Sequence, residues 1–157
     1  MKLKSILMMA VVAVCTMACK EDKPIADSVV GSYSGTLEMT VAGNSAGSID
    51  LSVVITKTSD AVVSMAIVNE APAGAMSIGH LDIDGISVAD AGNSTYTLSK
   101  ETPDGGFTVV DTGSSSQTAW TFKSFTGTFD GTTLTLNMVA QPGAMPMPIT
   151  MVYKGSK

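Results

Sequence analysis

Arginine is absent from this sequence of 157 residues, because all nine basic residues are lysines. The guanidinium group is the planar, two-pronged donor that clamps phosphate and carboxylate groups, so sites of that kind are excluded. Fourteen acidic residues give a formal net charge of −5, and an acidic surface disfavours nucleic acid as a partner. Histidine occurs once, as His80, which leaves a single candidate for a histidine base. These absences disfavour an enzyme, and no cofactor is expected.

Cysteine is also scarce, since Cys15 and Cys19 are the two in the chain. If the mature chain begins at Cys19 and this residue carries lipid, no thiol remains for a disulfide, a nucleophile or a thiolate metal site. Stability must then come from an apolar core, for which residues 19–157 are long enough as one domain.

The N-terminus has the pattern of a secretion signal. Lys2 and Lys4 precede an apolar run at 6–18 that is too short to span a bilayer stably. The stretch 16–19, Thr-Met-Ala-Cys, resembles a relaxed lipobox, which predicts cleavage before Cys19 and lipidation of Cys19. We therefore expect a lipoprotein signal peptide at 1–18, a lipidated tether at 19–28 and one folded domain at 29–157.

The residues after Cys19 bear on location. Lys20-Glu21-Asp22 resembles the Cys-Lys-acidic-acidic signals that export lipoproteins to the outer face of some Gram-negative bacteria. We expect an outer-membrane lipoprotein exposed at the cell surface and held to the membrane by the lipid on Cys19. If the stretch is an ordinary charged tether, the protein faces the periplasm instead.

From residue 29 onward, apolar residues recur with a period of two, which is typical of half-buried strands. The two places where the alternation changes parity, at Asp84-Gly85 and between Phe122 and Phe125, predict β-bulges. The predicted strands are 31–41, 49–56, 61–69, 77–89, 94–100, 107–111, 117–129, 134–138 and 149–153. The pattern predicts an all-β fold, an antiparallel up-and-down eight-stranded barrel, with a β-sandwich as the alternative.

Three stretches resemble the calycin-like β-barrel domain of bacterial lipoproteins: Val30 to Leu37, Ile83 to Val88, and Phe125 to Leu134. The resemblance covers about 29–157 and implies a barrel related in shape to lipocalins, without catalytic residues to transfer. True lipocalins have Gly-x-Trp where this chain has Gly31-Ser32-Tyr33, and their stacking arginine has no counterpart.

Two polar patterns are candidate sites of chemistry. Gly43 to Gly47 matches G-x-S-x-G, but a nucleophile elbow needs a following helix, and here a strand is predicted to follow. His80, Asp82 and Asp84 alternate along one strand face and are weak candidates for a metal site, while a solvent-facing surface is the favoured interpretation.

Methionines and aromatics leave further alternatives open. Met145, Met147 and Met151 provide thioethers for Cu(I), for a pliable mouth to an apolar pocket, or for plain packing. The aromatic cluster between Trp120 and Phe129 fits core packing or, if part of it faces outward, stacking on sugars. The tripeptide 27–29 resembles an Asp-Ser/Thr-apolar O-glycosylation site in the expected tether.

Two functions therefore remain. The leading hypothesis is a non-enzymatic protein that binds a small apolar ligand inside the barrel. The alternative is a surface interaction or structural protein with a filled barrel that binds glycan or protein through loops. The residues predicted to line a ligand pocket are Tyr33, Leu37, Met39, Met65, Trp120, Met138, Met147 and Met151.

Overall fold

The computed structural model describes residues 23–69, 78–113 and 117–157. Its elements are α1 (Ile25–Val29), β1 (Gly31–Val41), β2 (Asn44–Ser59), β3 (Val62–Val68), β4 (His80–Gly92), β5 (Thr95–Ser99), β6 (Phe107–Val110), β7 (Ala119–Phe129), β8 (Thr133–Pro142) and β9 (Ile149–Ser156). In the described part of the chain, no helix is long and apolar enough to cross a membrane.

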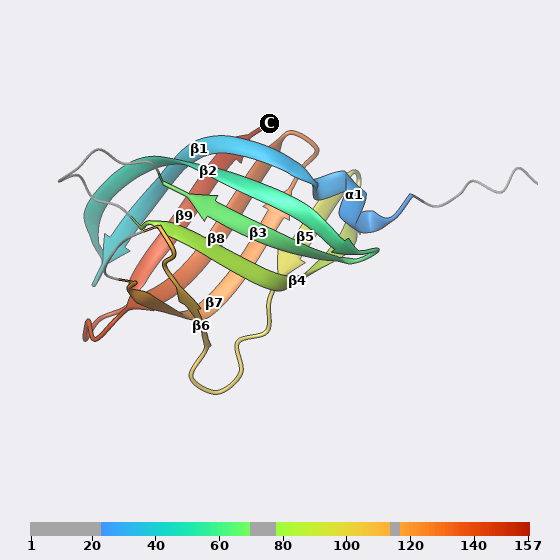
Figure 1. The fold of residues 1–157 in the computed structure, drawn as a ribbon. Helices are drawn as coiled ribbons and strands as arrows, with labels where there is room; N and C mark the ends of the chain where they lie inside the picture. The colour runs from blue at the N-terminus through green and yellow to red at the C-terminus, as the bar shows by residue number, and fades with distance from the viewer. Residues whose placement is uncertain (1–22, 70–77, 114–116) are drawn as a thin grey trace, which may run out of the picture.

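The strands form one antiparallel sheet that closes on itself. Their order is β5-β4-β3-β2-β1-β9-β8-β7-β6, and an additional pairing of β5 with β7 completes an eight-stranded barrel (Figure 1). Neighbours in sequence are neighbours in the sheet wherever a tight turn joins them, which gives the up-and-down topology. The predicted barrel is therefore confirmed, and closure excludes the open edges of a sandwich.

Two of the nine strands, β5 and β6, occupy a single position in the barrel wall. β5 pairs with the second half of β7, from Thr126 to Phe129, whereas β6 pairs with its first half, from Ala119 to Phe122. Since both strands run antiparallel to β7, they share one position in the barrel wall. An excursion at 100–106 separates them, so nine segments make an eight-stranded wall.

Both predicted bulges are present and flank this excursion. The β3–β4 register shifts opposite Asp84-Gly85, and the β7–β8 register shifts between Phe122 and Ser124. Gly85 has φ +68°, a conformation that a bulge commonly assigns to glycine. The Lys100 ammonium group donates to the Asp84 carbonyl at 2.6 Å, so the excursion is tied to the bulge in β4.

The barrel has two distinct ends. The helix end is formed by α1 with the β2–β3, β4–β5 and β7–β8 turns, whereas the loop end carries the β1–β2 turn and the β8–β9 loop (Figure 1). Apolar side chains from all eight wall positions fill the interior between these ends.

The last residues of the expected tether at 19–28 overlap helix α1, which packs against the barrel. Ala26 and Val29 have no exposed surface, and the Ala26 amide donates to the Asp60 carbonyl at 3.0 Å. An isolated helix of this length is unstable, so packing against the barrel end holds it. The possible glycosylation tripeptide 27–29 thus lies in this helix rather than in a free tether. Cys19 and the expected signal peptide at 1–18 lie outside the described residues.

Candidate functional site

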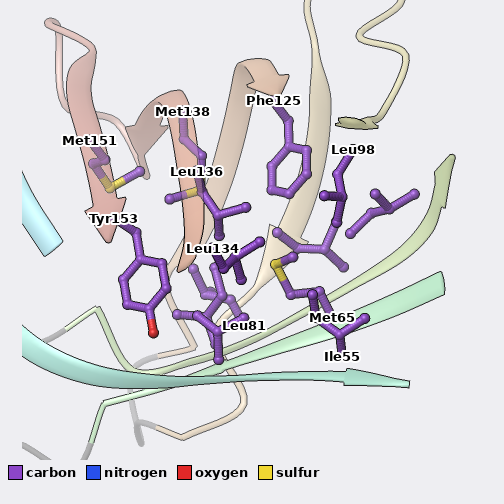
Figure 2. Close-up of a cluster of buried hydrophobic side chains, with 14 of the residues drawn as sticks. Ile55, Met65, Leu81, Leu98, Phe125, Leu134, Leu136, Met138, Met151 and Tyr153 are labelled. Atoms are coloured by element: carbon purple, nitrogen blue, oxygen red, sulfur yellow. The ribbon is translucent and has the colours of Figure 1, made fainter. Parts of the chain in front are cut away.

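Of the eight residues expected to line a ligand pocket, seven are buried in the core of the barrel. Their exposed fractions range from 0 to 6%, and the seven are Tyr33, Leu37, Met39, Met65, Trp120, Met138 and Met151. Met147 is different, because it lies in the β8–β9 loop and is 47% exposed. Figure 2 shows interior side chains such as Met65, Leu136 and Tyr153 converging from different strands.

The interior is closely packed. Leu37, Val53 and Leu136 have no exposed surface, and Met65 and Leu98 have 1% each. A cavity large enough for water would give its lining atoms accessible surface, so these side chains have no such cavity beside them. The aromatic cluster between Trp120 and Phe129 contributes four buried side chains to this core, and Phe107 stacks on Phe122 with ring centroids 5.0 Å apart.

Two buried tyrosines close the helix end. The Tyr33 hydroxyl donates to the Val29 carbonyl at 2.6 Å, and the Tyr153 hydroxyl donates to the Tyr33 carbonyl at 3.0 Å. Burial raises the pKa of both phenols to about 12, and for Tyr33 the proximity of Tyr153 adds to the effect. Because both hydroxyls already donate to the backbone, neither proton is left to orient a ligand.

Three methionines form a row near the loop end. Met151 in β9 lies directly opposite Met39 in β1 and Met138 in β8, and all three side chains are at most 3% exposed. This methionine row packs inside the barrel. Met145 and Met147 instead lie exposed in the adjoining loop, so Met151 is separated from the two thioethers with which it was grouped in sequence.

The weak metal candidates lie on the outer wall. The His80 Nε2 atom is 3.1 Å from a carboxylate oxygen of Asp82, and both side chains are partly exposed. Asp84 is also exposed, and its backbone carbonyl rather than its carboxylate accepts from Lys100. Within 23–69, 78–113 and 117–157, no group of three or more His, Cys, Asp or Glu side chains is arranged to hold a metal ion.

The G-x-S-x-G stretch is part of a hairpin. Ser45 lies at the beginning of β2, is exposed and pairs with Thr40 of β1. The segment that follows is a strand, as predicted, so the geometry of a nucleophile elbow is lacking at this position.

Sequence reasoning missed a buried carboxylate, Asp111, which is 4% exposed. One of its oxygens accepts from the His80 amide at 2.9 Å and from the Gly113 amide at 2.8 Å. It thereby joins the end of β6 to the beginning of β4. A Cβ atom on Gly79 would lie 2.1 Å from this carboxylate, so glycine is required there. The sequence signal for this carboxylate is the Asp-x-Gly spacing at 111–113, because an aspartate side chain often accepts from the backbone amide two residues further on.

An open groove of about 680 Å³ lies on the outer face of β1, β2 and β3. Hydroxyl groups and one carboxylate form its polar surface, and the Thr36 hydroxyl donates to the Asp50 carboxylate at 2.8 Å. The Asn69 amide group donates to the Asp50 carbonyl at 3.0 Å beside it. The residues that line this outer groove are Ser34, Gly35, Thr36, Asp50, Leu51, Ser52, Val54 and Val68.

Two solved structures resemble this one. The chain is 26% identical to a protein of Bacteroides fragilis NCTC 9343, named a "putative outer membrane protein", with a TM-score of 0.68 over 86% of this chain. The match covers 53% of that protein, so this chain spans about half of its length. A redesigned β-barrel matches with 9% identity and a TM-score of 0.49, over 85% of this chain and 96% of its own.

The curated proteins contain no match to this chain. A family model, the calycin-like beta-barrel domain, matches residues 29–156, which include all nine strands of the structure. Its match agrees with the closed antiparallel barrel described above. The chain therefore belongs to the calycin-like beta-barrel domain family.

Proposed function

We propose that this protein is a non-enzymatic outer-membrane lipoprotein, anchored through Cys19, whose filled barrel is a scaffold for binding at its outer surface. The observation that carries this proposal is the packed interior. An eight-stranded barrel is just wide enough either to be filled by side chains or to hold one small ligand. Interior side chains with 0–1% exposure favour the filled alternative.

The outer groove supports a polar ligand. Ser34, Thr36, Ser52 and Asp50 present hydroxyl groups and a carboxylate, and Val54 and Val68 add apolar surface to the same groove. Hydroxyl groups donate and accept hydrogen bonds and the carboxylate oxygens accept them, so this surface can pair with the hydroxyl groups of a glycan without a basic side chain. A glycan fits this chemistry better than an anionic partner does.

The location rests on two observations. Cys19 follows a stretch that resembles a lipobox, and the similar protein of Bacteroides fragilis is named as a putative outer membrane protein. Orientation toward the cell surface is part of the same proposal.

Lipidation is tested by expressing the full chain in a Gram-negative host with labelled palmitate. We expect label on the wild-type protein and its recovery in the outer-membrane fraction. Cys19→Ala should lose both, whereas Cys15→Ala should retain them. Equal labelling of the wild type and Cys19→Ala would refute this part of the proposal.

Groove binding is tested on an array of bacterial glycans. Asp50→Asn and Thr36→Val should each weaken binding severalfold, because they remove the charge or the hydroxyl of the Thr36–Asp50 pair. Asp82→Asn is the matched control on another part of the outer wall, and it should bind as the wild type does. Equal losses in all three variants would contradict a groove-specific site.

A small apolar ligand inside the barrel is the second candidate function. The methionine row of Met39, Met138 and Met151 favours it, because unbranched thioether side chains can change rotamer to admit a guest. Native mass of residues 24–157, purified from the natural host, separates the two candidates. The filled-barrel proposal predicts the bare mass, whereas an excess mass extractable into organic solvent would support the second candidate.

A further inference from the structure

The folded body begins very close to the proposed lipid. Five residues, 20–24, separate Cys19 from Ile25 at the start of α1. A fully extended chain spans at most about 3.6 Å per residue, so the Cα atoms of Cys19 and Ile25 are at most roughly 22 Å apart. The lipid must therefore enter the bilayer near whichever part of the barrel holds α1.

That part is the helix end, and α1 is fixed there by several contacts. Lys57 lies 3.2 Å from carboxylate oxygens of both Asp27 in α1 and Asp60 in the β2–β3 turn. Val29 is fully buried, and its carbonyl accepts from the Tyr33 hydroxyl. These contacts prevent α1 from acting as extra tether, so the distance limit applies to the barrel itself.

The helix end carries carboxylates, whereas at the loop end Asp111 lies buried in the β6–β7 connection. Turns at the helix end carry Asp60 and Asp130, and Asp27 lies beside them in α1. The β1–β2 turn at 42–43 and the β8–β9 loop at 143–148 contain no charged residue, and Met145 and Met147 are 46% and 47% exposed there. Carboxylates are costly to bury in hydrocarbon, so the helix end rests at the headgroups without inserting.

We propose that the helix end faces the membrane and that the loop end, with Met145 and Met147, projects away from it. This inference rests on the proposed lipidation of Cys19. The strands that join the ends are long, as shown by β1 with eleven residues. At about 3.3 Å per residue and a tilt near 40°, the two ends are separated by roughly 25 Å along the barrel axis.

The test uses a matched pair of cysteine variants, Ala61→Cys at the helix end and Ala144→Cys at the loop end. Both positions are exposed alanines in connections between strands. The Cys19 thiol of the mature lipoprotein is blocked by lipid, so the introduced thiol is the one available for a fluorophore. The labelled full-length lipoproteins are reconstituted from outside into phosphatidylcholine vesicles that carry an energy acceptor on the headgroups.

We expect energy transfer to be severalfold stronger from position 61 than from position 144. Equal transfer, or stronger transfer from position 144, in vesicle-bound and acylated protein would overturn the orientation. Mass spectrometry of the same samples reports the acyl chains separately. If the protein carries no acyl chains and stays in the supernatant, both the proposed anchor and this orientation are overturned. Failure of the anchor is therefore distinguishable from failure of the orientation alone.

Discussion

At the scale of single residues, the two buried tyrosines stabilise the helix end through hydrogen bonds to the backbone. Tyr33→Phe removes the bond to the Val29 carbonyl and leaves that buried acceptor unpaired. We expect the free energy of unfolding to fall by about 1–2 kcal/mol, measured by chemical denaturation. Tyr96→Phe is the control, because the Tyr96 ring stacks on Phe129 and the side chain is only half-buried. Equal losses would contradict a specific role for the Tyr33 hydroxyl.

The same tyrosines predict a loss of stability at alkaline pH. Burial raises the pKa of Tyr33 from 10.0 to about 12, so the folded state retains a proton that the unfolded state releases. The stabilising contribution is complete below pH 10 and is lost as the pH rises toward 12. Denaturation at pH 9 and pH 11 should therefore show a shrinking advantage of wild type over Tyr33→Phe. A constant advantage would refute the shifted pKa.

At the scale of elements, Asp111 joins the end of β6 to the beginning of β4. Asp111→Ala removes the acceptor of the His80 and Gly113 amides, which should cost about 1–3 kcal/mol of unfolding free energy. Hydrogen exchange at the His80 amide should also become faster. Asp104→Ala, at an exposed position in the excursion, should change neither quantity. Unchanged exchange at His80 would show that β4 is held there by other contacts.

The accuracy of the sequence-based prediction varied between elements. The bounds of strands with a solvent-exposed outer face, such as β1 and β7, were predicted closely, because burial of one face produces the alternation of apolar and polar residues. The bulges were predicted as well, since an extra residue changes the parity of the pattern. Helix α1 was missed because five residues are too few to display a helical period, and it depends on tertiary contacts.

At the scale of the whole molecule, α1 covers the helix end of the barrel. A chain that begins at Gly31 loses the buried Ala26 and Val29 side chains and the acceptor of the Tyr33 hydroxyl. Compared with a chain that begins at Pro24, it should be less stable by about 2–4 kcal/mol in thermal and chemical unfolding. Equal stability would indicate that α1 is part of the tether after all.

The packed interior makes a second prediction for the whole molecule. Leu136→Ala removes a side chain without exposed surface and should cost about 2–5 kcal/mol of unfolding free energy. The resulting apolar cavity should bind benzene or xenon, as detected by NMR shifts or thermal stabilisation. Wild type should show no such binding, and Val54→Ala on the outer face is the control for a smaller side chain. Binding of benzene by wild type would indicate room inside the native barrel.

By itself, the sequence determined the local geometry of this protein and its class. Alternation of apolar and polar residues specifies which face of each strand is buried, and glycine and aspartate mark the turns, because both effects act over a few neighbouring residues. Tertiary structure alone decided that β5 and β6 share one wall position. It also decided that Met39, Met138 and Met151 lie in one row while Met147 is exposed, and that side chains such as Leu136 have no exposed surface. These features depend on register and packing between segments far apart in the chain, and a pattern with a period of two does not encode which strands meet or how much space remains between them.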